Sequence, residues 1–195
     1  MYNKFLRTIR GLCLIFIVIA FCSSCKNLKV NREIKGLFGT KVDIPENLSI
    51  KIFGKDTLFH NQEDIFATLL IWYDSLQCTS CNLDYIEEWN RIYEYSADSI
   101  TGFKPIIIFS PSRKELYKFE ILIKVTDFKY PIYVDYDFAF ADRNSQIASF
   151  SSQKVFLLDK KHEIVLVGNP FLNKQMWKLY KSTINTLVAN KGVIP

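Results

Sequence analysis

Two cysteines, Cys78 and Cys81, stand in a C-x-x-C spacing, and this dithiol is the residue set best suited to chemistry. It directly follows a compact apolar run, residues 67–73, which is typical of a strand buried on both faces. From Cys78 to Tyr95, side chains then recur at helical spacing, which places Cys81, Tyr85, Trp89, Ile92 and Tyr93 on one buried face. The dithiol is therefore expected at the junction of a buried strand and a helix.

That position suggests a division of roles between the two thiols. Cys78 would lie at the start of the helix, where unpaired backbone N–H groups and the helix dipole favour a thiolate. Only the thiolate attacks a disulfide, so we assign Cys78 as the nucleophile. Cys81, one turn deeper on the same side, is the resolving thiol that releases the mixed disulfide. The hydroxyls of Thr79 and Ser80 are candidate donors to the thiolate.

Two other interpretations of the C-x-x-C pair stay open at this point. It can be a structural disulfide, although so short a loop restrains the unfolded chain little. It can be half of a zinc site, but there is no second C-x-x-C, and His60 and His162 lack ligand spacing. No phosphate-binding loop, dinucleotide-binding glycines or Ser-His-Asp set appears, so neither a metal nor a cofactor is expected.

The N-terminus has the pattern of an export signal. Three basic side chains fall within the first ten residues, and residues 12–21 form an apolar run that is short for a membrane span. Ser23-Ser24-Cys25 then resembles the lipobox of bacterial lipoproteins, in which the cysteine becomes the lipidated N-terminus. Lipidation at Cys25 is the favoured interpretation, and an uncleaved anchor over residues 11–24 is the alternative.

The expected organisation is a lipoprotein signal peptide at 1–24, a tether at 25–40 and one domain at 41–195. Residues 1–24 hold three of the 25 basic residues and none of the 20 acidic ones, which leaves a net charge near +2. Nucleic acid is not expected as a partner, because phosphate binding needs a concentrated basic face.

Strands and helices alternate through the domain, which predicts a mainly parallel sheet with helices on both faces and an antiparallel edge. Residues 41–44 and 49–53 alternate like short strands and suggest a small N-terminal β-hairpin, with a turn signal at 54–56. The remaining expected strands are 67–73, 105–109, 130–134, 154–158 and 164–167, and the expected helices are 78–95, 113–124 (capped by residues 110–112) and 176–188.

Residues 69–81 and the late hairpin, Phe156-Leu157-Leu158-Asp159 followed by Ile164-Val165, resemble the thioredoxin-like superfamily. The sequence looks closest to membrane-tethered thiol–disulfide reductases of the cytochrome-maturation type, over roughly residues 41–190. The resemblance implies an α/β fold: a thioredoxin-like three-layer α/β/α sandwich with a mixed central sheet, here with an N-terminal β-hairpin extension.

The sequence departs from that family at three positions. Gln153 stands where the family has a cis-proline facing the dithiol, Trp72 where thioredoxins carry a buried acid, and Gln77 where an aromatic residue is usual. A proton acceptor for Cys81 must then come from elsewhere. Asp74 is the candidate, with a solvated loop aspartate as the alternative interpretation.

The function expected from these residues is an exported, lipid-anchored thiol–disulfide oxidoreductase, periplasmic or on the outer membrane. Its partners would be cysteine-containing proteins, a redox partner and the membrane that holds the anchor. The absence of a cation beside Cys78 favours a reductase or isomerase over a strong oxidant. The alternative is a non-enzymatic binding lipoprotein of the same fold with a structural Cys78–Cys81 disulfide.

Overall fold

The computed structural model describes residues 32–58, 64–99, 101–150 and 154–195, and Leu37–Pro195 form one compact unit. The leader, Cys25, His60 and Gln153 lie outside the described residues, and so do the predictions made for them. Within those ranges, no helix combines the length and the apolar character needed to cross a bilayer.

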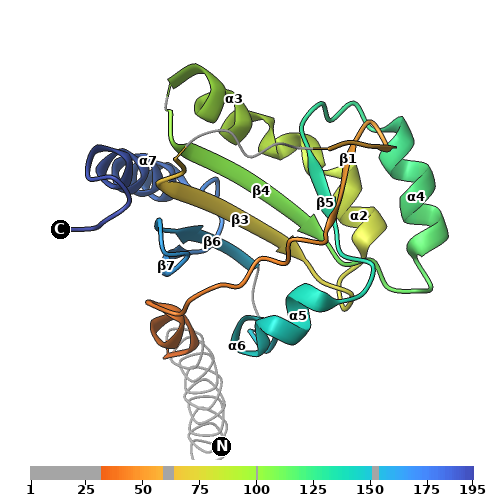
Figure 1. Cartoon of the computed structure of the whole chain (residues 1–195). Helices are drawn as coiled ribbons and strands as arrows, with labels where there is room; N and C mark the ends of the chain where they lie inside the picture. Colours follow the sequence, from red (N-terminus) through yellow and green to blue (C-terminus); the bar gives the residue numbers. More distant parts are fainter. Residues whose placement is uncertain (1–31, 59–63, 100, 151–153) are drawn as a thin grey trace, which may run out of the picture. The chain divides into compact units, whose positions relative to one another are not determined.

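A seven-stranded mixed sheet forms the centre of the compact unit, in the order β2-β1-β5-β4-β3-β6-β7 (Figure 1). The three inner strands β5, β4 and β3 are parallel, whereas β1, β6 and β7 run antiparallel to their neighbours. The strands are β1 Ser49–Ile52, β2 Lys55–Asp56, β3 Ala67–Tyr73, β4 Phe103–Phe109, β5 Ile132–Val134, β6 Lys154–Leu158 and β7 Ile164–Val167.

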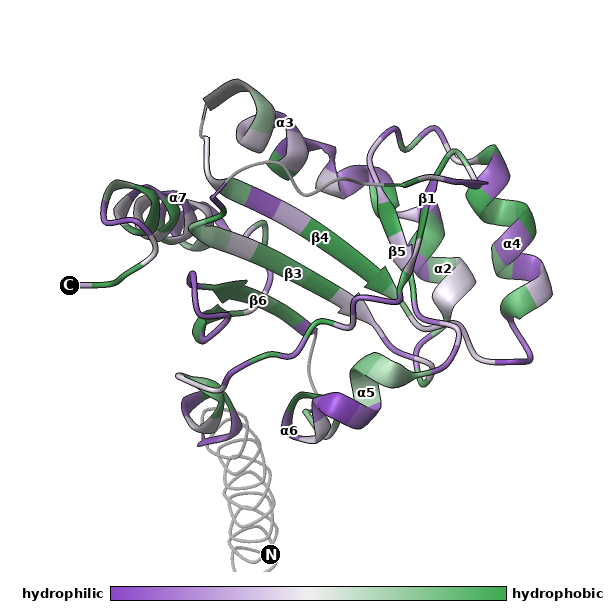
Figure 2. Ribbon diagram, viewed as in Figure 1, coloured by the Kyte–Doolittle hydropathy of each residue, from purple (hydrophilic) through white to green (hydrophobic). Residues whose placement is uncertain are grey.

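Helices cover both faces of the sheet, because β3, β4 and β6 are apolar on both sides (Figure 2). On one face, Leu69 and Ile71 pack in a core with α2, α3, α4 and α7. On the other, Trp72 packs on Phe140 of α5 with ring centroids 4.7 Å apart. The helices are α2 Thr79–Asp84, the 3-10 turn η1 Ile86–Trp89, α3 Asn90–Ser99, α4 Leu116–Val125, α5 Ala139–Arg143, α6 Ser145–Ala148 and α7 Lys174–Ala189.

This arrangement confirms the expected fold class, a three-layer α/β/α sandwich with a mixed central sheet and an N-terminal hairpin extension. The hairpin itself differs from the prediction, since its strands are β1 and β2 rather than residues 41–44 and 49–53. Phe53 and Gly54 both have positive φ, and they form the tight turn that joins β1 to β2. Lys41 instead bridges to Glu163 beside β7, and β1 extends the sheet by pairing with β5.

The single helix expected over residues 78–95 is wrong, because the segment is divided into α2, η1 and α3. Its buried side chains include Leu83, Ile86, Trp89 and Ile92, which recur every third residue. A 3-10 turn keeps residues three apart in line, whereas an α-helix rotates them off the core. Tyr85 breaks the α-helix and is 67% exposed, although helical spacing placed it on the buried face.

Candidate dithiol active site

Cys78 and Cys81 form a disulfide where β3 leads into α2, with their Cα atoms 5.3 Å apart. Cys78 is the N-cap residue of α2, and its Sγ accepts a hydrogen bond from the Cys81 N–H at 3.2 Å. Both cysteines are exposed. Cys81 is therefore not the deeper residue that the helical pattern predicted, and both cysteines lie at the surface.

The two hydroxyl residues between the cysteines are buried and differ in their hydrogen bonding. The Ser80 hydroxyl lies 3.6 Å from Cys78 Sγ and is the donor, because a disulfide sulfur has no proton. Thr79 Oγ1 is also buried, but no partner accompanies it among the described residues. Cys78 Sγ thus accepts hydrogen bonds from one amide and one hydroxyl, and both donors suit a thiolate better than a disulfide.

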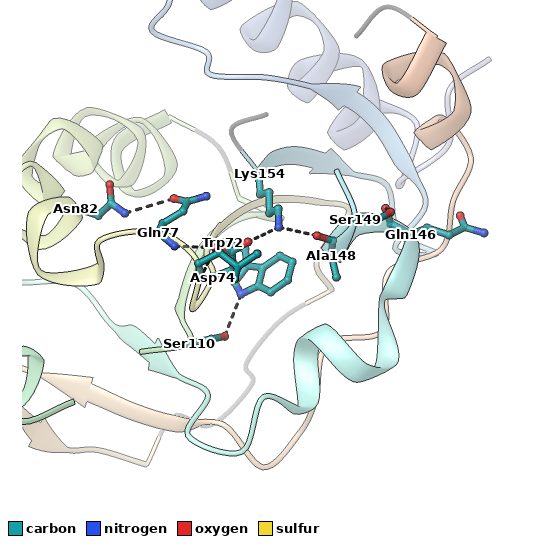
Figure 3. Close-up of polar contacts among 10 residues, drawn as sticks. Trp72, Asp74, Gln77, Asn82, Ser110, Gln146, Ala148, Ser149 and Lys154 are labelled. Atoms are coloured by element: carbon teal, nitrogen blue, oxygen red, sulfur yellow. Dashed lines mark hydrogen bonds and ion pairs between the residues drawn. The ribbon is translucent and has the colours of Figure 1, made fainter. Parts of the chain in front are cut away.

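Asp74 lies beneath the loop that leads to the dithiol and is not solvated (Figure 3). Its Oδ1 accepts from the N–H groups of Leu76 and Gln77, each at 3.1 Å, and so shapes the turn before Cys78. Its Oδ2 forms a buried ion pair with Lys154, the first residue of β6. With both oxygens engaged, Asp74 acts on the loop in this oxidised structure, and its expected role as a proton acceptor stays a prediction.

Lys154 is a buried cation and the first residue of β6, whose other residues are apolar. Its Nζ donates to Asp74 and, at 2.9 Å, to the Ala148 carbonyl, and it lies 4.5 Å from the centre of the Trp72 ring. These three contacts satisfy a cation whose side chain is only 4% exposed.

Trp72, at the position where thioredoxins carry a buried acid, is the first member of a second series of buried hydrogen bonds. Its Nε1 donates to Ser110 Oγ at 3.0 Å, and Ser110 donates to Asp135 Oδ2 at 3.2 Å. Asp135 also accepts from the N–H groups of Ala139 and Phe140 at the start of α5. This buried carboxylate therefore holds the start of α5 and, through Ser110, the indole of Trp72.

Glu115, the residue just before α4, contacts the residue that follows Cys78. Its Oε2 accepts from the Thr79 N–H at 2.7 Å, so a carboxylate caps the first residue of α2 beside Cys78. The expected helix over 113–124 consequently begins later, at Leu116, with no side-chain cap of its own. The Ser110 hydroxyl that was expected to cap it bonds to Trp72 and Asp135 instead.

Two further polar features border the site. Asn82 Nδ2 donates to Gln77 Oε1 at 3.4 Å, which ties the loop to α2. Burial raises the pKa of Tyr73, the last residue of β3, although its oxygen accepts a hydrogen bond from Trp89. In the described ranges, no three His, Cys, Asp or Glu side chains gather as a metal site would require.

Sequence reasoning missed Lys154 and Glu115. A lysine opening an apolar strand is a signal of a buried cation that needs a partner. Ser112-x-x-Glu115 has the spacing of a capping box, which would have assigned the glutamate to its own helix. Neither signal names the partner, since Lys154 lies 80 positions from Asp74 and Glu115 lies 36 from Thr79.

No protein-family model and no curated protein matches the chain. A thioredoxin-like protein in its oxidised form covers 79% of this chain and 97% of its own, at 16% identity and a TM-score of 0.48. The thioredoxin domain of a thiol-disulfide oxidoreductase from Bacteroides vulgatus covers 76% and 98%, at 16% and 0.45. An exposed lipoprotein thioredoxin from Streptococcus pneumoniae covers 64% and 87%, at 18% and 0.45. Each likeness is one of fold at low identity.

Proposed function

We propose that this protein is a thiol–disulfide oxidoreductase that reduces or exchanges disulfides of other proteins. The observation behind the proposal is the exposed Cys78–Cys81 disulfide at the end of a buried strand, with an amide and a hydroxyl donating to Cys78 Sγ. A structural bridge has no need of exposed sulfurs or of donors aimed at one of them. These features suit a pair that alternates between disulfide and thiolate.

The reaction balances as a two-electron exchange. In the reduced protein, the Cys78 thiolate attacks a substrate disulfide, forms a mixed disulfide and expels one substrate thiolate. Cys81 then loses its proton and attacks Cys78 Sγ, which forms the Cys78–Cys81 disulfide and releases the second substrate thiolate. The substrate gains two electrons and two protons, and a second dithiol protein returns the pair to the reduced state.

The proposal includes export and lipid attachment at Cys25, with the dithiol acting outside the cytosol. Its support is the basic start, the short apolar run and the Ser23-Ser24-Cys25 exit. Labelled fatty acid should be incorporated into the full chain and not into a Cys25→Ser variant. Equal labelling of the two proteins would contradict the anchor and leave the dithiol chemistry untouched.

The redox function is tested by trapping substrates in cells. With Cys81 replaced by serine, the mixed disulfide through Cys78 cannot be resolved, so adducts that dithiothreitol removes should accumulate. The Cys78→Ser protein is the matched control and should trap none, because it keeps the exposed sulfur of Cys81 but lacks the nucleophile. Equal adducts for the two variants, or none for Cys81→Ser, would refute the assignment.

A non-enzymatic binding protein with a fixed Cys78–Cys81 disulfide is the second candidate. It is favoured by Trp72, which leaves no acid at that position, and by the fully bonded Asp74 beneath the loop. The reduction potential separates the two candidates. A value below about −300 mV fits a structural bridge, and one between about −150 and −270 mV fits an exchanging pair.

A further inference from the structure

Glu115 is the charged group most directly placed to set the reactivity of the dithiol. Its carboxylate takes the Thr79 N–H, the backbone donor that immediately follows Cys78. The Cys81 N–H, by contrast, points to Cys78 Sγ. A Cys78 thiolate therefore shares the first turn of α2 with a second anion. This anion is the Glu115 carboxylate, which accepts the Thr79 N–H.

Other charged groups lie around the dithiol, and their positions decide which of them matters. Asp74 and Lys154 form a buried pair whose charges offset each other. Of the charged side chains in the described part of the chain, Glu115 is the one bonded to the backbone of residues 78–81. Other charged side chains on the elements that adjoin the dithiol include Asp84 on α2, Glu87 and Glu88 on η1, Arg113 and Lys114 before α4, and Lys118 and Glu120 on α4.

We propose that Glu115 is a positioning residue that holds the start of α2 and, through its charge, opposes the ionisation of Cys78 that the Cys81 N–H and the Ser80 hydroxyl favour. This deepens the proposed function, on which its biological meaning rests. A nearby like charge disfavours the thiolate. A reduced form that gains little from ionisation makes the disulfide easier to re-form, so the pair is tuned as a reductant and away from strong oxidation.

The size of the effect follows from the charge removed by Glu115→Gln, which keeps an oxygen to accept the Thr79 N–H. A like charge in contact range shifts a pKa by about one unit or more, and the half-buried position of Glu115 favours the lower value. The thiolate fraction at pH 7 then rises about tenfold. Because the nucleophilicity of a thiolate falls with its pKa, alkylation by iodoacetamide should accelerate about threefold.

The test uses the reduced full-length protein, with Cys78 alkylation followed from pH 5 to 10. Glu115→Gln should lower the apparent pKa of Cys78 by about one unit, whereas Glu87→Gln, which removes the same charge from η1, should leave it unchanged. Matching pH profiles for wild type and Glu115→Gln would overturn the proposal, because a purely structural cap does not move a thiol pKa. A failed substrate trap with a shifted profile would refute the redox function alone.

A measurement on the wild-type chain covers the case in which Glu115→Gln does not fold. Coupling between two titrating groups is reciprocal, so ionisation of Cys78 must also be sensed at the Glu115 carboxylate. The carboxyl carbon of Glu115, followed by NMR, should show a second titration step in the reduced protein and none in the oxidised protein. A single step in both states would overturn the proposal.

Discussion

Replacing Lys154 with methionine tests whether the buried ion pair beneath the dithiol loop stabilises the fold. Methionine is one atom shorter than lysine and keeps an unbranched apolar side chain, but it lacks the ammonium group. Asp74 is then left as a buried carboxylate whose side chain is 8% exposed, with the two loop N–H groups as its remaining partners. Removing one partner of a buried pair leaves an uncompensated charge, which costs far more than the pair contributes.

The expected loss of unfolding free energy is about 3–5 kcal/mol. The two N–H groups that still bond to Asp74 favour the lower end of that range. A domain of this size has about 5–15 kcal/mol in total, so Lys154→Met should lose at least about a fifth of its stability. Adding Asp74→Asn removes the orphaned charge and keeps an oxygen for Leu76 and Gln77. The double variant should therefore recover about 2 kcal/mol relative to the sum of the two single changes.

The assay is urea unfolding of the oxidised protein, followed by far-UV circular dichroism, for wild type, both single variants and the double variant. Arg143→Met is the control, because Arg143 and Asp43 form an ion pair whose side chains are 47% and 60% exposed. Its loss should cost less than about 1 kcal/mol. The buried pair does not stabilise the fold if two results are found together. Lys154→Met would lower the unfolding free energy no more than Arg143→Met does, and the losses of the two single variants would sum to the loss of the double variant.

Three further changes have expected outcomes of their own. Thr79→Val should change the unfolding free energy by less than about 1 kcal/mol, because the hydroxyl it removes is buried without a partner; urea unfolding checks this. Gly54→Ala should destabilise more than Gly39→Ala in thermal unfolding: φ is positive at both glycines, but only at Gly54 would the new Cβ approach the Lys124 Cα, at 2.9 Å. Burial raises the pKa of Tyr180, so the neutral phenol contributes to the free energy of unfolding below about pH 10, and this contribution is lost as pH rises further. Urea unfolding from pH 9 to 12 should therefore show a smaller loss of stability for Tyr180→Phe than for wild type.

Much of the fold could be predicted from local patterns. The apolar runs at β3, β4 and β6 identify buried strands, and the spacing from Met176 to Val188 identifies α7, because each pattern reflects the period of one element. The segment from Cys78 to Tyr95 could not be predicted in this way. Its three-residue and four-residue spacings fit two helix types, and the packing of Leu83 and Trp89 selected the 3-10 turn between them.

The candidate site also has one part that local sequence patterns predict and another that depends on tertiary contacts. The sequence by itself determined that Cys78 and Cys81 lie together where a buried strand meets a helix, because a C-x-x-C spacing and an apolar run are local features. Tertiary structure alone decided what surrounds them. Lys154 reaches Asp74 across 80 positions and Glu115 reaches Thr79 across 36, and only the pairing of β3 with β6 and the packing of α4 on α2 bring these groups together. The positions of the charged groups around the dithiol therefore depend on contacts between elements, whereas the pairing of the two cysteines depends on the order of the residues.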